Sequence, residues 1–177
     1  MNVCVYCASS ETIPASYVEL AADVGARLAR DGHGLVSGGG RVSMMGAVAR
    51  AARAGGAHTV GVIPRHLMAY EVADVEADEL IVVETMRERK RLMDERSDAF
   101  LALPGGLGTM EELFEIWTAR TLGMHAKPVV VLDPDGFYTP LWDYLTALGG
   151  RGFVRAPALD SLRRTTTVDD AFAALVL

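Results

Sequence analysis

One stretch of the chain combines residue types suited to phosphate chemistry: residues 103–112, with the sequence LPGGLGTMEE. It follows a short apolar run at 99–103 that is typical of a strand, and it leads into a helical pattern over 110–122. A glycine-rich turn between a strand and a helix points several backbone N–H groups at one place, where the helix dipole is positive. We therefore expect the N–H groups of residues 105–109 to bind a phosphate.

Glu112 sets this turn apart from a simple phosphate clamp, which has no need of a negative charge within one helical turn of its ligand. An enzyme that acts on a sugar beside the phosphate does need a carboxylate there. A structural interpretation stays open, because Thr109 and Glu112 have the spacing of a helix capping box. Ser16 and Glu19 show the same spacing at the start of another expected helix, where no chemistry is indicated.

The densest charge in the chain lies at residues 86–91, MRERKR. Mixed charges three and four residues apart are typical of a solvated helix face. This helix nevertheless begins just after an expected strand, on the edge of the sheet where ligands bind. Met86 and Lys90 share one helical face and Arg89 lies beside them, so a binding role is the alternative, because a guanidinium matches phosphate or carboxylate geometry.

A second glycine cluster, SGGG at 37–40, also ends an expected strand. It lacks the third glycine of a dinucleotide fingerprint, because Ser43 stands at that position, and no lysine of a phosphate-binding P-loop follows. We expect Gly39 and Gly40 to allow close approach of a phosphate or ribose, and Ser9 in the loop after the first strand to lie at the same edge.

Metal and redox chemistry have little support in the sequence. Cys4 and Cys7 form a C-x-x-C, but both fall in a strand pattern that sends their side chains to opposite faces, so we expect buried structural thiols. The four histidines share no metal-ligand spacing. A Schiff-base cofactor would have to use Lys90 or Lys127, and neither has the apolar surroundings that activate a lysine. We expect no metal and no organic cofactor.

Length and composition indicate a globular protein. The 177 residues predict a single domain over 1–177; half are hydrophobic, and the net charge is −6. This charge argues against a nucleic-acid partner, and the absence of a long apolar run argues against a membrane span. The N-terminal residues enter a strand pattern without a basic lead or cleavage site, so we expect no signal peptide and a cytoplasmic location.

Strand and helix patterns alternate along the chain. Mostly continuous apolar runs predict strands at 3–7, 34–37, 59–63, 80–83, 99–103 and 129–132. Helices are expected at 15–30, 42–54, 86–97, 110–122 and 139–148. This alternation predicts an α/β fold of the Rossmann-like, doubly wound kind, with a mainly parallel sheet and helices on both faces. The loops after the first, second and fifth strands would then converge where such sheets bind ligands.

Read in order, these motifs resemble the LOG ("lonely guy") family of cytokinin riboside 5′-monophosphate phosphoribohydrolases, which older descriptions label possible lysine decarboxylases. The resemblance covers most of the chain. It rests on CVYCASS at 4–10, GGG at 38–40, GVIP at 61–64, RK at 89–90, SDAF at 97–100, PGGLGTMEE at 104–112 and LGMHAKPV at 122–129.

The resemblance implies a Rossmann-like homodimer without cofactor, whose active site draws on both subunits. Arg89 and Glu112 match the family's catalytic pair, and Lys90 matches the motif partner of Arg89. The phosphate loop is matched by Gly105, Gly106, Gly108 and Thr109. This chain departs from the family pattern at several positions outside the catalytic pair: Ala8, Ser37, Arg41, Ser43 and Thr121.

We therefore expect hydrolysis of the N-glycosidic bond of cytokinin riboside 5′-monophosphates, and of AMP, to free base and ribose 5-phosphate. Three roles are open to Glu112: stabilising positive charge on the ribose, acting as a nucleophile, or activating water as a base. Arg89 would orient the phosphate or Glu112, or assist the departing base. The alternatives are a broader nucleoside-monophosphate nucleosidase and a nucleotide-binding protein that does not cleave its ligand.

Overall fold

The protein forms one seven-stranded sheet, described for residues 1–176 in a computed structural model. The sheet order is β4-β3-β2-β1-β5-β6-β7, and every neighbouring pair is parallel. The strands are β1 (Asn2–Tyr6), β2 (Gly34–Ser37), β3 (Thr59–Pro64), β4 (Glu79–Val83), β5 (Ala99–Ala102), β6 (Val129–Leu132) and β7 (Leu162–Thr165). The predicted doubly wound α/β fold is confirmed.

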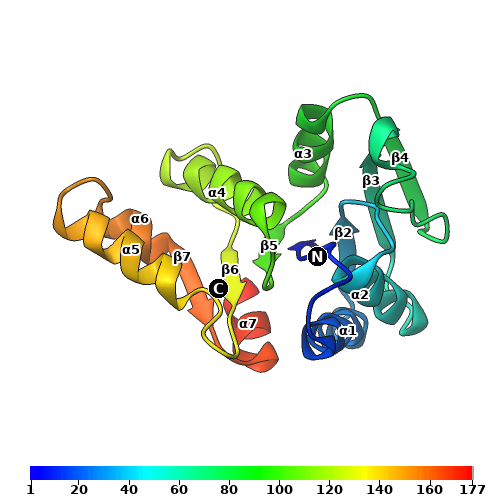
Figure 1. Ribbon diagram of the computed structural model, residues 1–177, viewed down its shortest axis with the longest axis horizontal. Coiled ribbons are helices and arrows are strands. Elements are labelled where there is room, and N and C mark those ends of the chain that lie inside the picture. The colour runs from blue at the N-terminus through cyan, green and yellow to red at the C-terminus, as the bar shows by residue number, and fades with distance from the viewer. Residues whose placement is uncertain (177) are drawn as a thin grey trace.

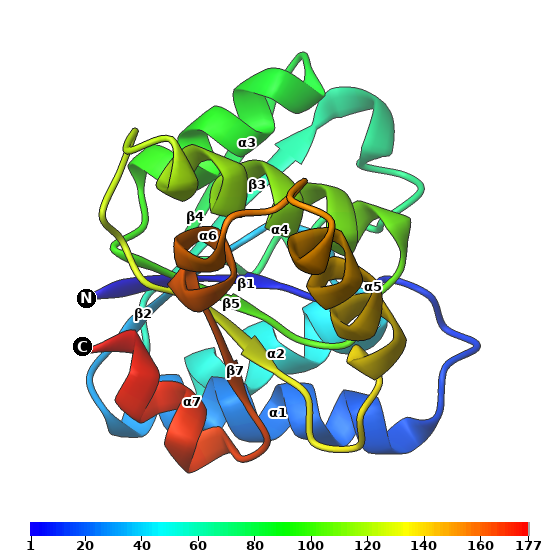
Figure 2. The same cartoon turned by 90° about the vertical axis from the view of Figure 1, so that its left-hand side faces the viewer.

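Helices cover both faces of this sheet (Figures 1 and 2). One face carries α1, α2 and α7, and the other carries α3 and α4, with α5 and α6 alongside α4. The helices are α1 (Ala15–Arg30), α2 (Ser43–Ala54), α3 (Met86–Glu95), α4 (Leu107–Thr121), α5 (Thr139–Gly150), α6 (Ala156–Ser161) and α7 (Val168–Leu175), with one short 3-10 helix, η1 (Arg65–Leu67).

The central strands are apolar throughout because each of their faces is buried against a helix layer. In β1, Val3 and Val5 pack in the layer with α1 and α2, whereas Cys4 and Tyr6 pack in the layer with α3 and α4. Cys7 belongs to the first layer, so the two thiols lie on opposite sides of the sheet, both free and buried. Burial raises the pKa of each thiol. The prediction of buried structural thiols is confirmed.

The order of the strands reverses direction between β1 and β5, because the chain builds outward to β4 and then returns to the other side of β1. In open parallel sheets a ligand crevice forms at such a switch, outside the carboxyl ends of the strands. The loops after β1, β2 and β5 meet there, as the sequence predicted. The fold thus brings residues 7–10, 37–40 and 104–109 to one edge.

Several sequence predictions need correction. The helix expected at 110–122 begins at Leu107, because Gly106 has an extended backbone that serves as N-cap; Thr109 is therefore inside the helix and its hydroxyl accepts no capping bond. The expected cap at Ser16 is also wrong, since Pro14 precedes the first helical residue. The capping box that does form lies at Thr85 and Glu88, at the start of α3. The sequence analysis missed η1, α6, β7 and α7.

No helix among residues 1–176 has both the length and the apolar character needed to cross a membrane.

Ser43, one of the departures from the family pattern, has a backbone φ of +48°, in the left-handed region that favours glycine. Its hydroxyl is buried without a hydrogen-bond partner among the described residues. We expect Ser43→Gly to raise the free energy of unfolding by up to about 1 kcal/mol, because relief of a left-handed side-chain clash of about 1–2 kcal/mol exceeds glycine's entropic cost. Urea unfolding measures this change.

Ser16→Gly is the matched control, because Ser16 also lies in the first turn of a helix but has ordinary helical backbone. We expect it to lower the unfolding free energy by roughly 0.5 kcal/mol. Equal losses in both variants would show that the Ser43 backbone carries no strain.

Candidate active site

A cavity of about 260 Å³ occupies the switch point at the carboxyl ends of β1, β2 and β5. Its walls come from the loop after β1, the glycine run after β2, the segment after β3, α3, and the first turns of α4. The polar and charged side chains in its lining are those of Ser9, Ser10, Glu71, Arg89, Thr109, Glu111 and Glu112, with Tyr6 and Cys7 at its base. Segments far apart in the sequence therefore build one site.

The start of α4 forms one wall of this cavity. Thr109 is buried, and its side chain lies so close to Gly105 that a Cβ there would be 2.1 Å from the Thr109 hydroxyl oxygen. The first intrahelical bond is the one that the Met110 N–H donates to the Gly106 carbonyl at 3.0 Å. The N–H groups of residues 107–109 thus have no partner within the helix, which makes this turn suited to an anion.

Glu112 follows on the same helix, half-buried in the cavity wall. Because Thr109 is not a cap, the capping-box interpretation of Glu112 is wrong. Desolvation by burial raises the pKa of the Glu112 carboxyl to about 7; Arg89 opposes this rise, whereas Glu111 and Glu71 add to it. A carboxyl group with this pKa exchanges its proton readily at neutral pH, which suits acid–base chemistry.

Arg89 lies across the cavity on α3, with only 4% of its surface exposed. Its Nη2 donates to the Gly38 carbonyl at 2.8 Å and to a Glu71 carboxylate oxygen at 3.0 Å. Its Nε has no hydrogen-bond partner in residues 1–176. Arg89 and Glu112 therefore share one cavity, as expected, but the direct ion pair of the guanidinium is with Glu71.

The other expected site residues divide into two groups. Ser9, Met86, Gly106, Gly108 and Thr109 line the cavity. The remaining four lie outside its lining. Gly105 packs beneath Thr109, Gly39 against β3 and Gly40 against the Glu71 backbone, while Lys90 forms ion pairs with two acids of α4.

Both lysines of the chain lie in contact with carboxylates. Lys90 contacts Glu111 and Glu115; although desolvation alone would lower its pKa, these carboxylates raise it. Lys127 contacts Asp94 at 2.7 Å. A lysine that forms a Schiff base must be a neutral amine, so the raised pKa of Lys90 does not favour that chemistry. In the described part of the chain, no group of three potential ligand side chains is placed to hold a metal ion.

Sequence reasoning missed the two hydrogen-bond partners of Arg89 Nη2, Glu71 and Gly38. In the glycine run we expected Gly39 and Gly40 to lie next to the ligand. Instead, the carbonyl of Gly38 accepts a hydrogen bond from Arg89 in the cavity wall. Glu71 lies in an irregular segment without periodicity. The one signal for it is a single acid in the otherwise uncharged run LMAYEVA at 67–73.

Comparisons with known proteins show which family the chain resembles. A family model described as "Possible lysine decarboxylase" matches residues 45–175. A Mycobacterium tuberculosis protein named cytokinin riboside 5′-monophosphate phosphoribohydrolase is 54% identical, over 98% of this chain and 92% of that protein. The chain belongs to the LOG family. A rice relative (Oryza sativa subsp. japonica), cytokinin riboside 5′-monophosphate phosphoribohydrolase LOG, is 44% identical over 89% of this chain and 65% of its own length.

The LOG-family fold also occurs in a more distant solved structure. The molybdenum cofactor binding protein of Rippkaea orientalis matches with a TM-score of 0.73, over 97% of this chain and 93% of that one. The two sequences are 21% identical, so this likeness shows the fold alone.

Gly38 tests the placement of the guanidinium, because a Cβ at this residue would lie 1.9 Å from Arg89 Nη2. We expect Gly38→Ala to displace Arg89 and to lower the unfolding free energy by about 1–3 kcal/mol, the usual cost of overpacking a buried site. Urea unfolding measures the loss. Gly150→Ala is the control, because nothing lies within 4 Å of a Cβ at that helical position. A fully stable Gly38→Ala protein would contradict the described contact.

Proposed function

We propose that this LOG-family enzyme hydrolyses the N-glycosidic bond of cytokinin riboside 5′-monophosphates and of AMP. The products are the free base and ribose 5-phosphate. The observation that carries the proposal is one cavity that combines a helix N-terminus suited to phosphate with a half-buried carboxyl group of raised pKa. The names of the relatives, one of which matches over 92% of its length, support the same reaction.

The phosphate group of the nucleotide would bind at the N–H groups of residues 107–109. These groups and the dipole of α4 favour an anion, and the Thr109 hydroxyl lies in the same wall. Binding energy from a phosphate that does not react holds the ribose in place for the reaction. We therefore expect the enzyme to prefer nucleotides to nucleosides.

Glu112 is the general base in our proposal. Water adds to C1′ of the ribose as the C1′–N bond breaks, and Glu112 takes a proton from the water. The bonding electrons leave with the base, which takes up a proton from solvent, and Glu112 then returns its own proton to solvent. The ribose carries positive charge in the transition state, as in other glycoside hydrolyses, and a carboxylate beside it is stabilising. The cation of Arg89 offsets repulsion between the phosphate and Glu112.

The nucleobase would lie against the apolar part of the lining. Leu67, Met45 and Met86 contribute side chains to this wall, and Met86 is partly exposed. Thioether side chains adapt to ligands of irregular shape. This wall supports acceptance of an adenine with an apolar substituent as well as plain adenine.

Glu112→Gln tests the proposed reaction. We expect the variant to fold normally and to lose about 10²- to 10⁴-fold in kcat for base release, because the amide cannot accept the proton. The measurement is chromatography of free base from AMP and from isopentenyladenosine monophosphate. Glu19→Gln, at an exposed position of α1 outside the cavity lining, is the control and should stay active. Wild-type protein that binds both nucleotides without releasing base would favour the non-catalytic alternative.

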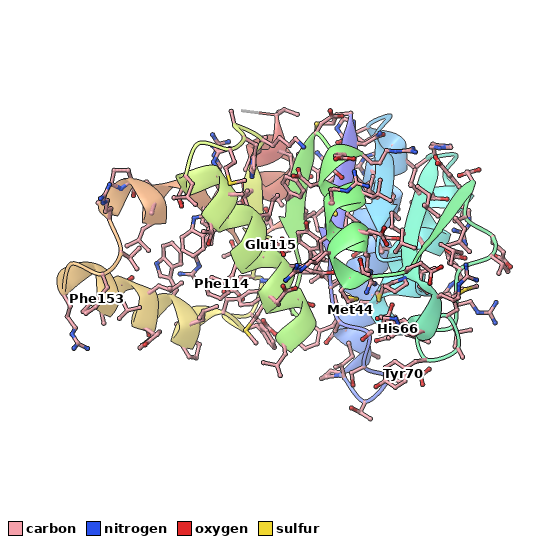
Figure 3. All side chains as sticks on the ribbon, turned by 90° about the horizontal axis from the view of Figure 1, so that it is seen from above. Met44, His66, Tyr70, Phe114, Glu115 and Phe153 are labelled. Atoms are coloured by element: carbon pink, nitrogen blue, oxygen red, sulfur yellow. The ribbon has the colours of Figure 1, made fainter. Side chains whose placement is uncertain are left out.

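We also propose a homodimer that completes the active site at its interface. Two hollows of about 830 and 900 Å³ flank the outer side of α4. Figure 3 shows Phe114 and Glu115 on this helix, with Phe153 at the far end of the protein. Leu122 and Met124, just after α4, are 71% and 75% exposed. One hollow shares Glu111 and Glu112 with the cavity. A second copy of the chain bound in that hollow would therefore also form part of the cavity wall.

Analytical ultracentrifugation tests this assembly. We expect twice the mass of one chain for the wild type and a shift toward one chain for Leu122→Glu, because a charge at an apolar interface must be desolvated. Val75→Glu, a substitution at a similarly exposed residue before β4, is the control. A wild-type protein that sediments as a single chain at assay concentration would contradict the dimer.

A cytoplasmic location is the third part of the proposal. Cys4 and Cys7 are free, buried thiols on opposite sides of β1. Thiols that stay unpaired suit a reducing compartment.

A further inference from the structure

Tyr138 is a buried tyrosine outside the cavity lining whose hydroxyl group reaches the turn before α4. It is the N-cap residue of α5, which Figure 2 shows beside α4, and only 4% of its surface is exposed. Its hydroxyl donates to the Leu103 carbonyl at 2.7 Å. Leu103 immediately precedes the proline and two glycines that lead into α4. A side chain from another element therefore binds the backbone of the turn that forms the proposed phosphate site.

The turn over residues 103–105 is fixed at successive positions. The carbonyl of Pro104 accepts a backbone N–H from the loop after β1 at 3.3 Å, and the carbonyl of Leu103 accepts the Tyr138 hydroxyl. The next residue, Gly105, packs directly against the Thr109 side chain. A shift of the Leu103 carbonyl would therefore pass through Gly105 to the first turn of α4, whose free N–H groups face the proposed phosphate.

Asp133, just after β6, holds the backbone of Tyr138. Only 2% of its side chain is exposed. One carboxylate oxygen accepts the Tyr138 N–H at 3.2 Å, and the other accepts Nη2 of Arg164 from β7 at 3.1 Å. The Arg164 guanidinium also lies 5.0 Å from the centre of the Trp142 ring of α5, a favourable distance for a cation–π contact. Because both oxygens of this buried carboxylate are bonded, its orientation is fixed, and so is the position of Tyr138.

The Tyr138 hydroxyl is kept in the form that can donate a hydrogen bond. Burial raises the pKa of the phenol, and the nearby Asp133 carboxylate and Cys7 add to this rise. The backbone N–H of Gly105 acts in the opposite direction. Only a protonated phenol can donate to a carbonyl, so the contact with Leu103 persists at neutral pH.

We propose that Tyr138 is a positioning residue of the phosphate site, which fixes the turn at 103–105 and thereby the direction of the N–H groups at the start of α4. This inference rests on the proposed binding of phosphate at residues 107–109. Tyr138 touches no part of the nucleotide; it acts through the backbone of the turn. It therefore matters for ligands that carry a phosphate group and not for those that lack one.

The test compares base release from AMP with base release from adenosine, which lacks the phosphate. Tyr138→Phe keeps the ring and removes the hydroxyl. We expect its kcat/KM for AMP to fall by about tenfold to a hundredfold, because a misplaced phosphate holds the ribose less well for the reaction. Its kcat/KM for adenosine should equal that of the wild type. An equal loss for both substrates, or no loss for AMP, would overturn the proposal.

Tyr17→Phe is the matched control. The Tyr17 hydroxyl donates to the Asp135 carboxylate at 2.6 Å, so it binds a side chain of the β6–α5 connection and not the turn before α4. Its preference for AMP over adenosine should equal that of the wild type. Thermal melting checks the fold of each variant.

If Tyr138→Phe does not fold, Asp133→Asn takes its place. An amide has one acceptor oxygen for the two donors that the carboxylate of Asp133 binds, so the variant cannot hold both Tyr138 and Arg164. We expect the same selective loss for AMP, of about threefold to tenfold, the usual effect of one lost hydrogen bond. An unchanged preference for AMP would overturn the proposal.

Binding measurements distinguish failure of this inference from failure of the proposed reaction. Calorimetric titration of AMP and of adenosine into Glu112→Gln protein, with and without Tyr138→Phe, needs no turnover. We expect Tyr138→Phe to weaken AMP binding by about threefold to tenfold and to leave adenosine binding unchanged. Equal affinity of the two proteins for AMP overturns the role of Tyr138, whatever the assay shows. Selective weakening, alongside a wild-type protein that releases no base, would support the role of Tyr138 and reject the reaction.

Discussion

The buried guanidinium of Arg89 is the interaction on which the rest of the site depends. A cation with 4% of its surface exposed needs partners, and it finds them in the Gly38 carbonyl and the Glu71 carboxylate. Its neighbours follow from this requirement: residue 38 must lack a Cβ, and the segment after η1 must deliver an acid. The same cation lowers the pKa of Glu112 and so opposes the effect of burial. The charge of Arg89 therefore affects both the packing of the cavity wall and the protonation of Glu112.

The fold brings the segments that carry these charged groups to one edge of the sheet. Strand order reverses between β1 and β5, which opens a crevice into which five separate segments project. The phosphate wall comes from α4, and Arg89 comes from α3, whose start is fixed by the Thr85–Glu88 capping box. The ion pairs of Lys90 with two acids of α4 tie these helices together. Lys90 therefore supports the site from outside the cavity.

Much of this arrangement could be predicted from the sequence, for identifiable physical reasons. Continuous apolar runs mark strands buried on both faces, and glycine-rich turns mark the helix start that faces a ligand. The edge strand β7, Leu162–Thr165, was missed because its two arginines break the apolar pattern. Glu71 was missed because its position depends on contacts with Arg41, Gly39 and Arg53, which no local pattern encodes. Spacing alone also left a capping box at Thr109 open, although a helix that starts at Leu107 rules it out.

A crystal structure of Glu112→Gln protein with AMP bound is the most direct test of the account. We expect the phosphate within hydrogen-bond distance of the N–H groups of residues 107–109, and C1′ of the ribose beside the side chain of residue 112. Arg89 should keep its contacts with Gly38 and Glu71. A nucleotide whose phosphate lies away from the start of α4, or whose C1′ faces away from residue 112, would contradict it.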